Sequence, residues 1–376
     1  MLNKDTSSVF TRQHTDIAKG IAILLMLYHH LFVLQERIHC EYFSVLNIFG
    51  FNVEVTLANF SKLCVCIFVF LTGYGLYYSL IKYSENIFLS YKKLIKRAFS
   101  FLFNYWVIFL TFIPIGICLG VYKFDISDIL CAFLGANTSR YSSEWWYISQ
   151  YLVLLFIFPS LNYLFSKAKL YKKIIVLSVY IMVYALAKIS TSIFSNNVFF
   201  DYYIGKLKPS FVIITFVVGF LCAKYDIYSK TISLLNKYRL NKTIFSVCIL
   251  IISIIIRVMF SNNAEGMHVD FIVVPMFIVG STTLLYNTCI SKILIYLGKH
   301  STNMWLTHTF WCYYFWQPIV FLPYVSTFIF IWLIVLSLLT SYIINLVHIP
   351  LSNLIFGKEH RLSYKGYFYW FGKKGK

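Results

Sequence analysis

The sequence PYVSTFIFIWLIVLSLLTSYIINLV occupies residues 323–347 and contains no charged side chain. An α-helix rises ~1.5 Å per residue, so a run of roughly 20 apolar residues crosses the ~30 Å hydrocarbon core of a membrane. A helix also satisfies its backbone hydrogen bonds internally, as a lipid environment requires. This stretch therefore predicts a transmembrane helix.

Similar apolar runs recur along the whole chain. Of its 376 residues, 59% are hydrophobic and only 12% are charged, whereas about a quarter of the residues in a soluble domain are charged. The predicted spans are residues 16–35, 56–81, 98–120, 145–165, 172–190, 209–224, 243–261, 269–288, 301–317 and 323–347. We expect an all-α fold, a polytopic membrane bundle of about ten transmembrane helices.

The distribution of charge predicts the orientation. About three quarters of the 33 Lys and Arg residues fall on one side of the membrane if the N-terminus is cytoplasmic, and most of the 14 Asp and Glu residues fall on the other. This pattern predicts a multi-pass protein of the cell (inner) membrane with both termini in the cytoplasm. The basic residues form short clusters between apolar runs, which indicates membrane lipid and no nucleic acid as a partner.

The same pattern predicts three regions: a cytoplasmic N-terminal segment (1–15), a membrane domain (16–350) and a basic, aromatic cytoplasmic tail (351–376). The first apolar run is long and lacks a small-residue cleavage site, so we expect it to remain as a helix. The nine Cys residues include no CxxC pair and no zinc-like His/Cys spacing, so no metal site is expected.

Ionisable residues within the first span need a physical reason. Lys19 and His30 are separated by eleven positions, which places them roughly 20° apart on one helix face and about 16 Å apart along the helix axis. Asp16 precedes Lys19 by three positions and is able to pair with it. The alternative is that Lys19 reaches toward the membrane surface and that His30 hydrogen-bonds a neighbouring helix.

A second set lies at the predicted start of the ninth span. The stretch LGKHSTNMWLTH (297–308) places Ser301 and His308 on one helix face, and Gly298 with Ser301 predicts a helix start that Ser301 caps. His308 is then expected about two turns into the membrane from the same side as His30. A packing role for His308 is the alternative.

Several stretches together carry a family resemblance. They are Asp16 to His30; Phe68 to Tyr74, which includes Gly73; the basic cluster Lys92, Lys93, Lys96 and Arg97; Trp145 and Trp146 through Tyr151 to Pro159; Phe216 to Ala223; and Leu297 to His308. In this order and spacing, the sequence resembles the acyltransferase 3 family of multi-pass membrane O-acyltransferases. Lys19 stands where the family more often has arginine, and Asn104 where it usually has proline.

The resemblance implies a reaction and roles. His30 would be the catalytic base, Asp16 would orient Lys19, and His308 would stabilise the oxyanion or relay a proton. Lys19, Lys96 and Arg97 would hold the phosphates of acetyl-CoA, which is a donor substrate and not a permanently bound cofactor. The positive-inside rule is the alternative explanation for Lys96 and Arg97.

A carbohydrate acceptor would meet aromatic and acidic groups: Glu144, Trp145, Trp146 and Tyr151. An interfacial aromatic belt is the alternative explanation for the Trp pair. The expected activity is transfer of an acyl group, expected to be acetyl, from cytoplasmic acyl-CoA to a hydroxyl of a cell-surface carbohydrate or its lipid-linked precursor. The sequence leaves open acetyl or succinyl, the side on which the acceptor is acylated, direct transfer or a covalent intermediate, and the oligomeric state.

Two other functions compete with this one. A transporter or flippase of a sugar-containing lipid or small solute predicts repeat symmetry and broken helices in matching halves, and the sequence contains neither. A scaffold without chemistry predicts that replacing His30 or Lys19 changes only the abundance of the protein.

Overall fold

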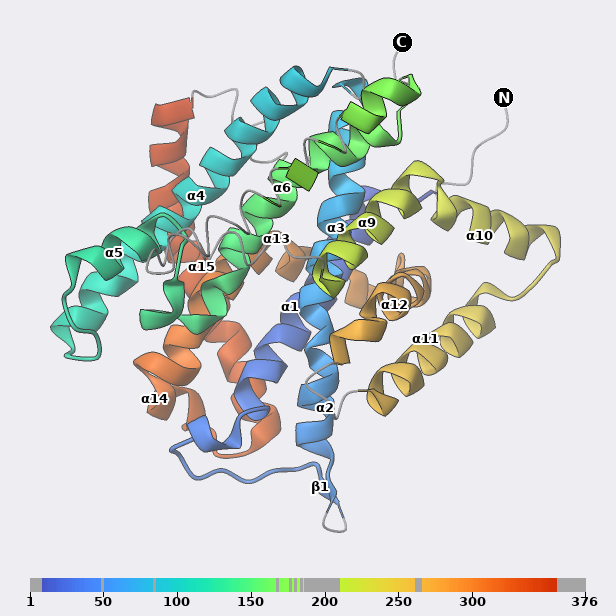
Figure 1. Ribbon diagram of the computed structural model, residues 1–376. Helices are drawn as coiled ribbons and strands as arrows, with labels where there is room; N and C mark the ends of the chain where they lie inside the picture. The colour runs from blue at the N-terminus through green and yellow to red at the C-terminus, as the bar shows by residue number, and fades with distance from the viewer. Residues whose placement is uncertain are drawn as a thin grey trace. The chain divides into compact units, whose positions relative to one another are not determined.

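The computed structural model describes residues 9–48, 51–83, 86–166, 169–175, 210–260 and 266–356, with a few single positions between 176 and 185. Within these ranges the fold is helical apart from one antiparallel pair of two-residue strands, β1 (Asn47–Ile48) and β2 (Phe51–Asn52) (Figure 1). The predicted all-α class is confirmed.

The helices, in chain order, are α1 (Arg12–Phe32), α2 (Val53–Ser61), α3 (Leu63–Leu80), α4 (Ile87–Cys118), α5 (Ile126–Phe133), α6 (Tyr147–Leu164), α9 (Phe211–Lys224), α10 (Ile227–Lys237), α11 (Lys242–Met259), α12 (Asp270–Leu285), α13 (Cys289–Thr309), α14 (Gln317–Phe321) and α15 (Ser326–Phe356). The short 3-10 helices are Gln35–Arg37, Ile81–Tyr83, Thr138–Arg140, Ser143–Trp146 and Gly266–Val269, and Phe310–Tyr314 forms a π-helix.

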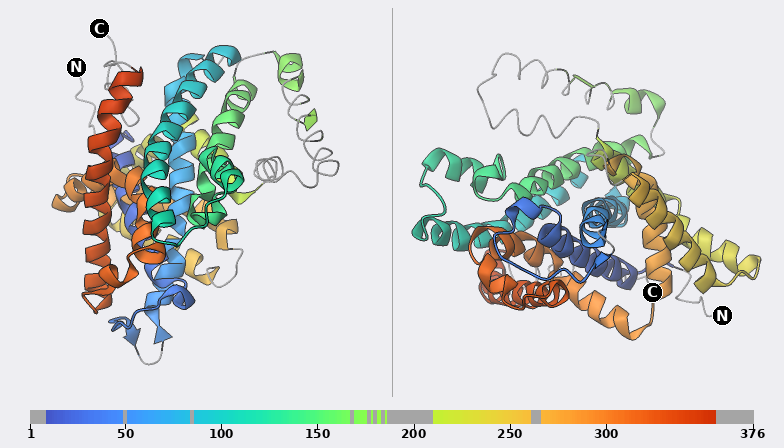
Figure 2. Two further views of the ribbon diagram at one scale, coloured as in Figure 1. Left: turned by 90° about the vertical axis from the view of Figure 1, so that its left-hand side faces the viewer. Right: turned by 90° about the horizontal axis from the view of Figure 1, so that it is seen from below.

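The chain folds as two compact units. Unit 1 combines Met1–Gly75 with Ile214–Lys376, and unit 2 is Leu76–Ile213. Unit 1 therefore holds α1, α2, most of α3, most of α9, and α10 through α15, whereas unit 2 holds α4, α5 and α6. In unit 1, α15 is the long red helix in the left panel of Figure 2.

Five helical segments among the described residues are long and apolar enough to cross a membrane. They are Val53–Tyr83, Ile87–Cys118, Ser143–Leu164, Lys242–Met259 and Ser326–Phe356. Helices α9 and α10 form a pair bent by 56° that would add a sixth. The count of ten spans remains a prediction, and most of the predicted span 172–190 and most of the tail 351–376 lie outside the described residues.

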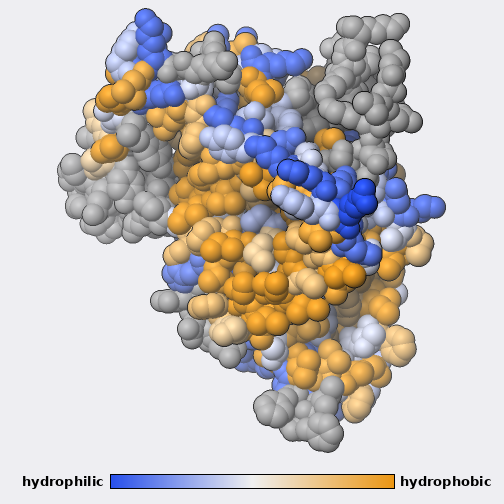
Figure 3. Space-filling model, turned by 90° about the vertical axis from the view of Figure 1, so that its right-hand side faces the viewer, coloured by the Kyte–Doolittle hydropathy of each residue, from blue (hydrophilic) through white to orange (hydrophobic). Residues whose placement is uncertain are grey.

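The polarity of α11 is the reverse of that of a helix in a soluble protein. Its exposed side chains include many isoleucines, and they contribute to the hydrophobic surface in Figure 3. Its buried side chains are Ser246, Ser253 and Arg257. The Arg257 Nε lies 2.7 Å from Oδ1 of Asp270 on α12, and both side chains are buried. This arrangement suits a helix that faces lipid and pairs its charge inward.

Glycines set the helix crossings in unit 1. A Cβ atom on Gly20 would lie 2.1 Å from the backbone oxygen of Leu294, and one on Gly298 would lie 2.2 Å from the backbone oxygen of Asp16. Helices α1 and α13 therefore touch backbone to backbone, as small residues permit between membrane helices. Gly73 of α3 and Gly219 of α9 allow the same kind of backbone contact between those two helices.

The predicted helix start at Ser301 is wrong. Helix α13 begins at Cys289, and Thr288 caps it by accepting a hydrogen bond from the Ser291 N–H at 3.2 Å. Ser301 instead lies inside the helix, where its hydroxyl donates to the Gly298 carbonyl at 2.9 Å. The charged Lys292 and Lys299 broke the apolar run in the sequence, but a helix continues through them because lysine is a good helix former.

Candidate functional site

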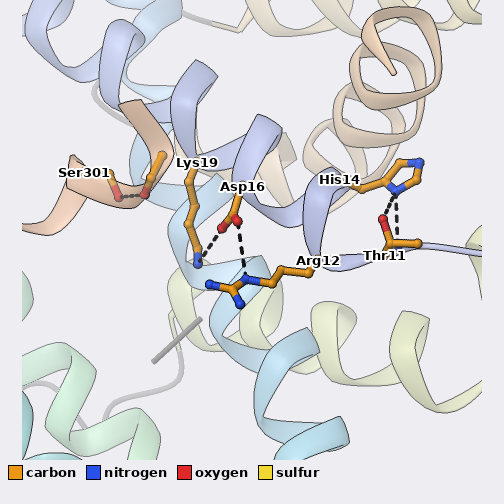
Figure 4. Close-up of polar contacts among 7 residues, drawn as sticks. Thr11, Arg12, His14, Asp16, Lys19 and Ser301 are labelled. Atoms are coloured by element: carbon orange, nitrogen blue, oxygen red, sulfur yellow. Dashed lines mark hydrogen bonds and ion pairs between the residues drawn. The ribbon is translucent and has the colours of Figure 1, made fainter. Parts of the chain in front are cut away.

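The first turns of α1 organise two cations around one carboxylate (Figure 4). Asp16 lies 3.9 Å from the Lys19 Nζ and 3.4 Å from the Arg12 Nε. The side chains of Asp16 and Lys19 are 4% and 10% exposed, so solvent screens this pair little. Lys299, which follows Gly298 on α13, also acts electrostatically on Asp16. The result is a net positive group at one end of α1.

At the other end of α1, two predicted imidazoles meet. The rings of His30 and His308 lie 5.0 Å apart between centroids, with an angle of 50° between their planes. The Nδ1 of His30 is buried and makes no hydrogen bond among the described residues. Because an unpaired buried polar atom is unfavourable, it marks a place where a ligand or a proton is expected to bind.

The hydrogen bonds of His308 define its tautomer. Its Nδ1 lies 2.8 Å from the Trp305 carbonyl oxygen and 3.1 Å from that of Met304. A carbonyl oxygen only accepts, so Nδ1 carries the proton and donates it. In the neutral ring, Nε2 therefore holds the lone pair. His308 is thus able to take up a proton at Nε2.

His29 has a different role from its neighbour. Its Nδ1 donates to the Ala58 carbonyl at 2.7 Å and so joins α1 to α2. The ring of His30 is directed about 100° away around the helix, toward α13. His29 is a packing residue that joins the two helices.

The π-helix that follows His308 brings an aromatic residue to the same place. The Tyr313 ring lies 5.9 Å from that of His30 at an angle of 86°, and its hydroxyl donates to the His30 carbonyl oxygen. Isolated π-helical turns within α-helices often occur at functional sites, because they change the direction of the side chains that follow. Here the turn adds a third ring to the His30 and His308 pair.

Unit 2 holds the remaining predicted site residues. The Arg97 Nε donates to the Tyr151 hydroxyl at 2.9 Å, and Lys96 is exposed. The Glu144 carboxylate accepts hydrogen bonds from the hydroxyls of Ser142 and Ser143 at 3.3 and 2.7 Å. The structure therefore brings together one residue predicted for the donor, Arg97, and one predicted for the acceptor, Tyr151.

The structure corrects the prediction for Trp145. Its side chain is 0% exposed and packs edge-on against Tyr105, with ring centroids 5.0 Å apart. A ring that is enclosed on all sides has no free face to stack on a sugar, so Trp145 belongs to the core of unit 2. Trp146 is only partly buried.

Sequence reasoning missed two residues of the site. Arg12 stands four positions before Asp16, and this helical spacing was a signal that it would share the carboxylate with Lys19. No such signal in the sequence identified Tyr313. This residue lies in a π-helix, so the α-helical spacing does not give the helix face on which its side chain lies.

Comparison with known proteins assigns the family. The sequence model of the acyltransferase 3 family, described as an acyltransferase domain, matches residues 14–346, a range that includes Asp16, Lys19, His30 and His308. Neither the comparison with curated proteins nor that with solved structures finds a match. The family match covers most of the chain, and the described residues include several helices able to cross a membrane. The chain therefore belongs to the acyltransferase 3 family and is a membrane acyltransferase.

Proposed function

We propose that the protein transfers an acyl group, expected to be acetyl, from acyl-CoA to a hydroxyl of a cell-surface carbohydrate or its lipid-linked precursor. The observation that supports this best is the pair of imidazoles, His30 and His308, on helices that also carry Lys19 and Lys299, eleven and nine residues before the respective histidine. Acyl transfer to an alcohol needs a base at the hydroxyl and cations for the donor phosphates.

The donor binds at the Asp16 end of α1. Arg12 and Lys19 flank the Asp16 carboxylate, which fixes both cations and leaves the group with a net positive charge. Phosphate groups of CoA bind such cations through charge-assisted hydrogen bonds. Lys96 and Arg97 of unit 2 are further candidates for this role.

His30 acts as the base. Its unpaired ring nitrogen takes the proton of the acceptor hydroxyl as the oxygen attacks the thioester carbonyl carbon. The new C–O bond forms, the C–S bond breaks, and the CoA thiolate leaves with the electron pair of that bond. A proton then returns to the thiolate sulfur, so the products are an ester and free CoA.

His308 serves as the proton relay. Because its Nδ1–H is held by the two backbone carbonyls, the neutral ring offers a lone pair and no donor at Nε2. That favours uptake of a proton from His30 over hydrogen-bond donation to an oxyanion. The imidazolium that results is able to return the proton to the leaving thiolate.

The acceptor is expected to contact unit 2 through Glu144, Trp146 and Tyr151. Glu144 and Tyr151 already bond to neighbouring polar groups, which fixes the direction of their oxygens. Aromatic rings and carboxylates of this kind bind sugars by stacking on C–H faces and by accepting from hydroxyls.

The test is a donor-consumption assay in nanodiscs. Wild type, His30→Ala and His29→Gln are purified and shown to be equally folded, then given radiolabelled acetyl-CoA with glycolipid and polysaccharide from the host. We expect label in a glycan for wild type and His29→Gln, and none for His30→Ala. Equal transfer by His30→Ala would refute its role as the base, and donor turnover by none of the proteins would refute the proposed activity.

A further inference from the structure

Arg37 lies next to the His30 site, at the end of α1 opposite Lys19. Its guanidinium carbon is 4.8 Å from the centre of the Tyr313 ring, and the same ring contacts His30. Arg37 also acts electrostatically on His30. A cation thus lies beside the proposed base, far along α1 from the cations at its other end.

The position of Arg37 is built by the fold. The Gln317 amide nitrogen donates to the Arg37 carbonyl and to the Cys312 carbonyl, both at 2.8 Å. The oxygen of the same amide accepts from the His39 N–H at 2.8 Å. Gln317 is buried and so fastens the segment after α1 to the π-helix that carries Tyr313. The Gln317 side chain therefore holds Arg37 close to the Tyr313 ring.

The chemistry of the guanidinium suits an anion. It is planar and carries its N–H donors in a fixed fork. That fork matches the two oxygens of a carboxylate or a phosphate, whereas a lone hydroxyl engages only one donor. Arg37 is only partly buried.

We propose that Arg37, which lies over the Tyr313 ring, recognises a negatively charged group of the carbohydrate acceptor and places its hydroxyl at His30. The acceptor class is then an anionic glycan, in which the charge comes from a sugar carboxylate or from a phosphate at the anomeric carbon. The inference rests on the proposed function and adds to it a site in unit 1. Gln317 is a positioning residue in this arrangement.

Binding tests the site without any turnover. Three probes share one sugar ring: methyl glucoside, methyl glucuronide and glucose 1-phosphate. Their Kd values for protein in nanodiscs are measured by saturation-transfer difference NMR with wild type, Arg37→Gln and Arg37→Lys. We expect one of the charged probes to bind wild type about tenfold tighter than methyl glucoside, since a charge-assisted hydrogen bond is stronger than a neutral one. Tighter glucuronide indicates a carboxylate, and tighter glucose 1-phosphate a phosphate.

The variants separate recognition from folding. Arg37→Gln is expected to remove the preference, and Arg37→Lys, which lacks the planar fork, to keep only part of it. Arg140→Gln is the matched control, because it removes an exposed cation from unit 2 and should preserve the preference. Glu36→Gln removes an exposed negative charge beside Arg37 and should tighten the charged probe. The Kd for CoA should stay unchanged in all four variants.

The outcomes distinguish the two proposals. Equal binding of charged and neutral probes, or a preference that survives in Arg37→Gln, would overturn the role of Arg37, as would no binding of any probe to wild type. Charge-selective binding with no acyl transfer to any acceptor would leave the site standing and remove the proposed activity. Acyl transfer that depends neither on the charge of the acceptor nor on Arg37 would support the proposed activity and overturn the role of Arg37.

Discussion

Two histidines that are adjacent in the sequence, His29 and His30, differ in what their ring nitrogens contact. His29 donates to a backbone carbonyl of α2, whereas His30 Nδ1 is buried without a hydrogen-bond partner among the described residues. The His29 hydrogen bond stabilises the pair of helices α1 and α2. The unpaired ring nitrogen of His30 remains available as a base. Spacing in the sequence gives the direction of each side chain, but only the neighbouring helices decide which ring is satisfied.

Replacing His308 tests the relay. His308→Ala should lower kcat by about 10²–10⁴-fold, as loss of a proton-transferring group typically does, while the KM for acyl-CoA changes little. Steady-state kinetics in nanodiscs measure both constants. His29→Gln, which still donates to Ala58, is the matched control and should keep kcat. Unchanged kcat in His308→Ala would rule out the relay.

Lys19 is the cation that is predicted to bind the donor. Lys19→Gln should raise the Kd for CoA about tenfold or more, because a hydrogen bond to a charged group contributes ~1.5–3 kcal/mol. The Asp16 carboxylate then has Arg12 as its remaining partner within α1, which makes the local charge less positive. Isothermal titration with CoA measures the change. A Kd equal to that of wild type would remove Lys19 from the donor site.

At the scale of elements, the contact between α1 and α13 depends on glycine. Gly298→Ala would place a Cβ 2.2 Å from the backbone oxygen of Asp16, so the helices must separate. We expect a loss of about 1–3 kcal/mol in stability and weaker CoA binding, because Asp16 moves. Thermal unfolding and CoA titration measure the two effects.

Gly75 on α3 is the control for that substitution. A Cβ there would meet no atom within 4 Å, so Gly75→Ala should be neutral or should stabilise the helix by roughly 0.5–1 kcal/mol. If both glycine variants behave alike, the close approach of α1 and α13 does not depend on Gly298.

The start of α1 should respond to pH. His14 precedes the predicted span 16–35, and burial lowers the pKa of its imidazole from 6.5 to about 4. Its Nδ1 accepts from the Thr11 N–H at 3.1 Å, and its ring stacks on Tyr286. The unfolded chain therefore binds a proton near pH 6.5 that the folded protein binds only near pH 4. Stability should fall as the pH falls through that window.

Hydrogen exchange at the first turn of α1, measured between pH 7.5 and 5, reports this loss. His14→Gln has no group that titrates in this range, so its protection should vary less with pH than that of wild type. Equal pH dependence in the two proteins would assign the effect to another group.

At the scale of the whole molecule, the orientation is a prediction from charge. Reporter fusions at the N-terminus and after Lys376 should both report the cytoplasm, and a reporter inserted near Glu41 should report the opposite side. A cytoplasmic signal at Glu41 would contradict this orientation, and with it the cytoplasmic side expected for the donor site. Such mapping starts from the five helical segments among the described residues that are long and apolar enough to cross a membrane.

The sequence by itself determined the class of the fold and the position of the site residues along their helices. Long apolar runs determine helices because lipid leaves no other way to satisfy the backbone. The helical period then placed Lys19 and His30 on one face of α1. Gly73 and Gly298 could be recognised in the sequence as parts of the family motifs. The sequence offers no physical reason why these positions are glycine.

Only the tertiary structure decided which of these residues meet. It supplied the reason for the glycines, since each lies where two backbones touch. It moved the start of α13 to Cys289, buried Trp145, and brought Arg37 and Tyr313 to His30 through a π-helix and the Gln317 amide. These contacts join residues far apart in the chain, and a local period carries no information about them. Helix packing and hydrogen bonds between segments set them.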